Sequence, residues 1–254
     1  MLSRLLPTQG IHNFRDYGGY RTDAGGHVTL GKLFRSGQHC DATPDDLALV
    51  SQIWLATVVD LRSDSERAQY PCARPEDFQG DVLFASGNTL GAASHLDAAK
   101  GVRTAADAHQ AMVELYRAMP FRPVLQKSYR LYCQRLADLD SASLIQFLAG
   151  KDRTGLAVAL LHHQLGVHSD DIFEDYLLTN VAGDLDRRVA AGAEAVRSNF
   201  GADMTDAAVR TMMSVDAAFL HTAFEVIGDV GRYCEEVLGI TPGQQNKLRL
   251  GLTG

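Results

Sequence analysis

Apolar and polar positions along the chain fall into two kinds of pattern. Short segments that predict strands lie at residues 33–36, 57–62, 81–85 and 142–147. The segment 57–62 is β-branched and apolar until it meets a charge pair, which is typical of a buried parallel strand that ends at a functional edge. A Gly-containing turn within residues 20–30 predicts a hairpin. Longer segments with helical periodicity lie at 44–52, 105–119, 124–139 and 156–165, and a short helix follows Ser63. Strands that alternate with helices predict an α/β fold with a mostly parallel central sheet flanked by helices.

Local signals place several helix boundaries. Thr43 is a predicted N-cap with Pro44 at the first helical position, and Gly166 is a predicted C-cap. From residue 170 onward the pattern is helical, with breaks near Gly183, Gly201 and Pro242. We expect a single domain over 1–254 with a helical C-terminal half, in which residues 184–227 form a helical lid or an insertion. The stretch 86–101, rich in Gly, Ala, Ser and Asn, predicts a loop or a lid.

Composition narrows the class of protein. Of the 254 residues, 46% are apolar, which is typical of a chain with a full core and excludes a disordered one. The chain has 24 basic and 31 acidic residues, so its net charge is −7, which argues against nucleic acid as a partner. The sequence shows neither an apolar run of transmembrane length nor a secretory signal. We therefore expect a cytoplasmic protein without a membrane span, whose four cysteines are reduced thiols.

The segment that points to chemistry is the turn AGKDRTG between the strand at 142–147 and the apolar helix at 156–165. A Gly-containing turn that opens a helix aims several backbone N–H groups at one point, where the helix dipole favours an anion. Arg153 could grip two phosphate oxygens, Lys151 adds positive charge at the rim, and Asp152 could carry a proton. The turn lacks the glycine and hydroxyl spacing of a nucleotide-binding P-loop.

This turn resembles the signature loop of cysteine-dependent tyrosine and dual-specificity phosphatases, H-C-x-x-G-x-x-R. More narrowly, it resembles a bacterial branch whose loop reads H-C-x-A-G-K-D-R-T-G. Further segments agree with that branch in the same order, namely 13–20, 34–37, 59–63 with Glu66, 175–180, 238–241 and 248–249. The resemblance implies a tyrosine-phosphatase-like fold. It also implies a phosphate-binding loop made of Leu148, Ala149, Gly150, Lys151, Asp152, Arg153 and Thr154.

The chain departs from the family at the nucleophile. Phe147 occupies the position of the family's Cys, and Gln146 occupies that of the preceding His. In the family a thiolate attacks phosphorus and forms a phosphocysteine, and a phenyl ring has no lone pair for that step. Thr154 matches the hydroxyl that would stabilise the leaving thiolate, so here we expect it to serve as an ordinary helix cap. The Phe147 ring either fills the phosphate cradle or turns into the core.

We therefore expect a tyrosine-phosphatase-like hydrolase by resemblance that is inactive or very weak, a pseudophosphatase without metal or cofactor. Its expected ligand is a phosphorylated protein, a phosphoinositide, or inorganic phosphate or sulfate. One alternative is an unconventional phosphohydrolase in which water replaces the thiolate, assisted by Arg153 and by Asp60 or Asp152 as base. In that branch Asp60 resembles a proposed general acid, and its other interpretation is a salt bridge to Arg62 or Arg15.

Two smaller alternatives complete the set of candidate sites. Cys40 follows a histidine, but the Gly-rich turn and arginine of the signature loop do not come after it, so it is a weak replacement nucleophile. His162, His163 and His168 lack the spacing and the additional ligands of a metal site. A last hypothesis is a regulatory scaffold in which Phe147 blocks the pocket.

Overall fold

The computed structural model describes residues 4–87 and 101–254 of the chain. Within these residues the chain forms a five-stranded sheet in the order β1-β2-β5-β3-β4. The strands from β2 to β4 pair in parallel, whereas the edge strand β1 pairs antiparallel with β2. The prediction of a mostly parallel sheet is confirmed. The strand bounds are β1 Arg15–Asp16, β2 Leu33–Ser36, β3 Thr57–Asp60, β4 Asp81–Leu83 and β5 Ser143–Gln146.

The register brings the carboxyl ends of three strands to one edge of the sheet. Gln146, the last residue of β5, is aligned with Ser36 of β2 and with Asp60 of β3. Because β5 lies between β2 and β3, the turn that follows it starts in the middle of this edge. Ligands of open parallel sheets bind outside the carboxyl ends of the strands, so this edge is where a site is expected.

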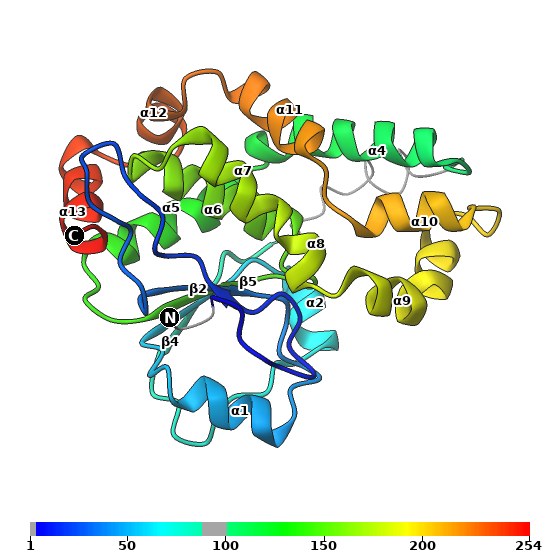
Figure 1. Ribbon diagram of the computed structural model, residues 1–254, viewed down its shortest axis with the longest axis horizontal. Helices are drawn as coiled ribbons and strands as arrows, with labels where there is room; N and C mark the ends of the chain where they lie inside the picture. The colour runs from blue at the N-terminus through cyan, green and yellow to red at the C-terminus, as the bar shows by residue number, and fades with distance from the viewer. Residues whose placement is uncertain (1–3, 88–100) are drawn as a thin grey trace.

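Helices cover both faces of the sheet. Figure 1 shows α1 (Pro44–Ser51) on one side and α5 (Pro123–Ala137), α6 (Asp152–Gln164) and α7 (Ser169–Leu177) on the other. Successive strand residues point to opposite faces. In β5, Leu144 therefore joins the small core beneath α1, whereas Ile145 joins the larger core around α5 and α6. Almost the whole of α6 is buried, as its apolar sequence predicts.

The C-terminal half is helical, as predicted. Its elements are α8 (Thr179–Ala182), α9 (Leu185–Phe200), α10 (Asp206–Met213), α11 (Ala217–Ile227), α12 (Val230–Arg232), the π-helical segment η2 (Tyr233–Val237) and α13 (Pro242–Leu252). The predicted breaks at Gly183, Gly201 and Pro242 are confirmed. In Figure 1, α9 and α10 lie with α4 (Ala105–Ala118) at one side of the molecule, and a small apolar cluster that includes Ala108 and Val209 joins α10 to α4.

Local signals near the N-terminus also correspond to the structure. Thr43 and Ser63 each begin a helix, α1 and α2 (Asp64–Gln69), with a capping box. The hairpin predicted over 20–30 is a chain reversal with one isolated bridge between Arg21 and His27. A short 3-10 helix, η1 (Met119–Phe121), joins α4 to α5. The loop or lid predicted over 86–101 lies mostly outside the described residues. Among the helices that the structure describes, none is long and apolar enough to cross a bilayer.

Candidate functional site

The turn between β5 and α6, residues 147–151, has a shape that depends on one glycine. Gly150 has a φ of +64°, and a Cβ at this position would lie 2.3 Å from the Ser36 carbonyl oxygen, so another residue would not fit. The carbonyl of Gly150 accepts hydrogen bonds from Asn13 Nδ2 at 2.7 Å and from Arg35 Nη2 at 2.9 Å. Two N-terminal side chains therefore hold the turn in place.

The backbone N–H groups of this turn are open. In the part of the chain that the structure describes, those of Leu148, Ala149, Gly150 and Lys151 donate no hydrogen bond. Lys151 is the N-cap of α6, and no side chain caps this helix. Several consecutive unpaired N–H groups at a helix N-terminus form a nest that binds an anion such as phosphate or sulfate. The phosphate-binding role expected of residues 148–154 stays a prediction.

Arg153 and Phe147 form a stacked pair at the start of α6. The guanidinium carbon of Arg153 lies 4.0 Å from the centre of the Phe147 ring, and this ring is 8% exposed and belongs to the larger core. The structure thus turns the ring toward the core, with the guanidinium above it. Burial lowers the pKa of Arg153 to about 10, opposed by Glu66, whose Oε2 lies 3.9 Å from Arg153 Nη1, so the guanidinium is charged at neutral pH.

The side chain of Lys151, which the sequence places at the rim of the loop, is bound to other parts of the protein. Its ammonium donates to the carbonyls of Met212, at 2.7 Å, and of Ser214, at 3.0 Å, and only 7% of the residue is exposed. Burial lowers its pKa, and Asp152, 3.3 Å away, opposes that effect. The carbonyls at the end of α10 lie within reach of this long side chain, so Lys151 fastens α10 to the loop.

Asp60 and Asp152 both have partners. Asp60, at the end of β3, accepts from Arg62 Nη2 at 2.7 Å and from Gln146 Nε2 at 2.9 Å and is nearly fully buried. Asp152 accepts from the hydroxyl of Tyr116 at 2.9 Å. Of the two salt-bridge partners considered for Asp60, the structure selects Arg62 and leaves Arg15 to another carboxylate.

That other carboxylate is Asp175 on α7, the centre of a buried ion cluster beneath the loop. Asp175 Oδ1 lies 3.1 Å from Arg15 Nε, and Asp175 Oδ2 lies 2.9 Å from Arg35 Nη1. Both arginines are fully buried. Burial alone would raise the pKa of Asp175, but the charges of Arg15 and Arg35 hold it well below its usual range. The cluster thereby orients Arg35, which holds the Gly150 carbonyl.

The chain is similar to known proteins over nearly its whole length. The model of the tyrosine phosphatase family matches residues 6–254. The chain belongs to the tyrosine phosphatase family. It is 29% identical over 241 residues to a protein of Cupriavidus necator named as a tyrosine-protein phosphatase, covering 92% of this chain and 84% of that protein. It is 27% identical to the triple specificity protein phosphatase PtpB of Mycobacterium tuberculosis, and the match covers the full length of both chains.

Thr154 does not take the helix-capping role expected for it in this phosphatase-family loop. It lies inside the first turn of α6, after the N-cap residue Lys151. Its hydroxyl oxygen is fully buried and has no hydrogen-bond partner among the described residues. A buried hydroxyl without a partner is unusual and needs an explanation.

The remaining sequence candidates of this phosphatase-family chain lie outside the loop. Cys40 donates to Asp41 Oδ2 at 3.4 Å, and burial together with that carboxylate raises its pKa to about 11, which disfavours a thiolate nucleophile. His162 is buried, with Nε2 2.8 Å from the carbonyl oxygen of Tyr17. Among the described residues, no three His, Cys, Asp or Glu side chains gather as a metal site would require.

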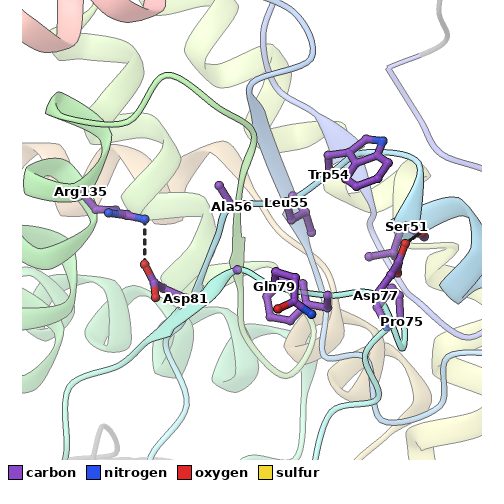
Figure 2. Close-up of a pocket in the computed structure, with 12 residues that line it drawn as sticks. Ser51, Trp54, Leu55, Ala56, Pro75, Asp77, Gln79, Asp81 and Arg135 are labelled. Carbon is purple, nitrogen blue, oxygen red and sulfur yellow. Dashed lines mark hydrogen bonds and ion pairs between the residues drawn. The ribbon is translucent and has the colours of Figure 1, made fainter.

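A pocket of about 360 Å³ lies at the opposite edge of the sheet (Figure 2). It is lined by residues that precede or begin strands, among them Ala56 before β3 and Asp81 at the start of β4. Its cation, Arg135, is engaged by Asp81 Oδ2 at 2.8 Å and by Thr57 Oγ1 at 2.7 Å. This pocket is therefore separate from the phosphatase-family loop, and its arginine is neutralised within the protein.

Proposed function

We propose that this protein binds a phosphorylated ligand in the loop 147–153 and lacks the covalent catalysis of its family. The observation that carries the proposal is the stacking of Arg153 on Phe147. Cation–π stacking uses the face of a guanidinium, whereas phosphate is bound by the N–H groups at its edge. The ring that replaces the nucleophile is therefore compatible with a phosphate-binding arginine. The expected ligands are a phosphorylated protein, a phosphoinositide, or inorganic phosphate or sulfate.

The loop supports binding through its backbone. The open N–H groups of Leu148 to Lys151 and the dipole of α6 favour an oxyanion, and the buried charge of Arg153 adds to this field. Gly150 allows the close approach to Ser36 that aims these groups at one point. The backbone N–H groups of Leu148 to Lys151 do not depend on the side chain at 147. Binding can thus persist where chemistry is lost.

The residue at position 147 cannot serve as the nucleophile that the family's reaction needs. Phe147 offers no nucleophilic atom, and loss of a nucleophile from a catalytic triad lowers turnover roughly a millionfold. Gln146, in place of the family's histidine, donates its amide to Asp60. The hydroxyl of Thr154 has no hydrogen-bond partner among the described residues. Because the family uses this hydroxyl beside the thiolate, its lack of a partner is a second sign that the nucleophile has been replaced. Attack by water would need a base, and both oxygens of Asp60 already accept from Arg62, whereas Asp152 accepts from Tyr116 on Oδ1 alone.

The experiment combines turnover and binding. We expect the wild type not to hydrolyse an aryl phosphate, but to bind inorganic phosphate, with binding weakened at least tenfold in Arg153→Ala. The matched control is Arg117→Ala, an exposed arginine of α4 whose Nε lies 3.5 Å from Glu114 Oε2. Turnover by the wild type that disappears in Arg153→Ala would show an unconventional hydrolase. Phosphate binding that is equal in wild type and Arg153→Ala would favour a scaffold with a blocked loop.

A gain-of-function pair tests the missing groups directly. We expect the double variant Gln146→His with Phe147→Cys to acquire aryl phosphatase activity that Arg153→Ala removes. Phe147→Cys alone should acquire less, because Gln146 and Asp60 remain paired behind the new thiol. A double variant that folds and binds phosphate but stays inactive would show that the loop has lost more than its nucleophile.

A further inference from the structure

Two adjacent arginines, Arg187 and Arg188, stand on the first turns of α9 beside a pocket of about 520 Å³. We call it the α9 pocket. It lies between α9 and the N-terminal segment, and His12 and Asp41 line its other side. The pocket is separate from the one in Figure 2, which is lined by none of the same residues. The lining of the α9 pocket has two arginines and one carboxylate, so its net charge is positive.

Neither arginine forms an ion pair within the described protein. The side chains of Arg187 and Arg188 make no hydrogen bond or ion pair with any described residue. The nearby carboxylates of α9 have other roles. Asp184 caps the helix by accepting from the Arg187 backbone N–H at 3.3 Å, and Asp186 pairs with Arg210 at 2.6 Å. Asp41 accepts from the thiol of Cys40.

The position of these cations on α9 disfavours a purely structural role. The N-terminal turns of a helix carry partial positive charge, so arginines are repelled there and acidic residues are preferred. The neighbouring imidazole also experiences this positive field. The pKa of His12 is lowered by burial and by the charges of Arg188 and Arg187. An anion placed among these groups would offset the repulsion between the arginines and the helix N-terminus. It would also offset the positive field that lowers the pKa of His12.

The α9 pocket borders the loop on the side of Lys151. Met213 lines the pocket and stands between Met212 and Ser214, whose carbonyls hold the Lys151 ammonium. Burial lowers the pKa of Arg188, and the charge of Asp152 opposes that effect. The charge of Arg188 in turn contributes to the lowered pKa of Lys151. Because the Lys151 ammonium is bound to carbonyls of α10 and Ser214, the half-buried Arg188 is a cation on this side of the loop that remains without a hydrogen-bond partner among the described residues.

We propose that the α9 pocket is a second anion-binding site, which takes a phosphate group through Arg187 and Arg188. Arginine forks bind phosphate oxygens in pairs, and two adjacent arginines match the charge of a phosphate dianion. The site is independent of the loop at 147–153. If both sites are filled by one molecule, an extension that rests on the proposed function, the ligand carries two anionic groups.

The test follows each site by its own signal. In an NMR titration of ¹⁵N-labelled protein with inorganic phosphate, the side-chain Nε–Hε signals of Arg153, Arg188 and Arg117 are recorded together. We expect the signals of Arg153 and Arg188 to shift and saturate, and that of the paired, exposed Arg117 to stay in place. Arg188→Gln should abolish saturation at the α9 pocket and leave the Arg153 signal responsive. Arg153→Ala should do the reverse.

A charge of the opposite sign gives a second check. Asp41→Asn removes the carboxylate that faces the arginines, so phosphate should bind the α9 pocket at least threefold more tightly. The His12 ring signals should titrate at higher pH when phosphate is bound, because the anion offsets Arg187 and Arg188 while Asp41 and Asp184 remain. This rise should be absent in Arg188→Gln.

The outcomes separate the two proposals. A response at Arg153 alone overturns the second site and leaves the proposed function standing. A response at Arg188 alone supports the second site and overturns phosphate binding by the loop. Equal responses at Arg188 and Arg117 would mean general charge screening, which also overturns the second site.

Discussion

Asp175→Asn is the substitution that most directly tests whether the buried ion cluster supports the site. The change removes one negative charge from between Arg15 and Arg35, both fully buried, and keeps nearly the same side-chain shape. Removing one partner of a buried ion pair costs about 3–5 kcal/mol, because the remaining charge is left without compensation. The Asn oxygen still accepts one hydrogen bond, so we expect a loss of about 3 kcal/mol.

The assay is chemical and thermal unfolding followed by circular dichroism at pH 7. A loss of about 3 kcal/mol corresponds to a fall in Tm of roughly 6–12 °C for a chain of this size. The matched control is Asp186→Asn, which breaks the exposed pair with Arg210 and should cost less than about 1 kcal/mol. Hydrogen exchange at the amides of Phe147 and Gly155, which donate to the carbonyls of Ser36 and Lys151, should also quicken in Asp175→Asn, because Arg35 holds the Gly150 carbonyl between them.

The reasoning would be refuted by a stability within about 1 kcal/mol of the wild type. It would also fail if Asp175→Asn and Asp186→Asn lost the same amount. A large loss of stability with unchanged exchange at Phe147 and Gly155 would show that the ion cluster stabilises the fold without shaping the loop.

Three further expectations follow from single side chains. The pKa of Asp175 is lower in the folded than in the unfolded chain, so its stabilisation is complete above about pH 4 and is lost as pH falls toward the folded value. Urea unfolding between pH 7 and 2 should therefore show a steeper acid decline for the wild type than for Asp175→Asn, and parallel curves would contradict this. Lys151→Met should lower the free energy of unfolding by about 1–3 kcal/mol and quicken hydrogen exchange over 206–214, because the carbonyls of Met212 and Ser214 lose their donor. Unchanged exchange would contradict the role of Lys151 in fastening α10 to the loop. Thr154→Val should change stability by less than about 1 kcal/mol in denaturant melts, because its hydroxyl has no partner, and a loss above about 2 kcal/mol would reveal one.

Helix boundaries could be predicted because their signals are local. Thr43 and Ser63 begin helices through hydrogen bonds to residues three positions away, and a glycine after a helix ends it through its own φ. The strand that precedes the loop could also be recognised from its apolar run. The order of the strands in the sheet depends instead on partners that are distant in the sequence. The same holds for the antiparallel edge strand β1, which no local pattern predicts.

The partners of the side chains in the site could not be predicted either, because these partners are also distant in the sequence. Lys151 lies in the loop by sequence, but its ammonium reaches carbonyls more than sixty residues away. Asp175 stands in a segment that resembles the family, yet its two arginines come from the other end of the chain. The sequence also left two positions open for the Phe147 ring, and the choice depends on the packing of Arg153 above it.

The contacts that shape the loop have a consequence for the order of events during synthesis. Asn13 reaches Gly150 over a separation of 137 residues, and Arg15 reaches Asp175 over 160. The N-terminal segment leaves the ribosome first, but it finds its partners only after α7 has emerged. Until then, buried arginines of the finished protein remain solvated, and the loop lacks the groups that hold its central carbonyl. The nest therefore cannot mature before α7 has emerged, and nascent chains released earlier would be without it.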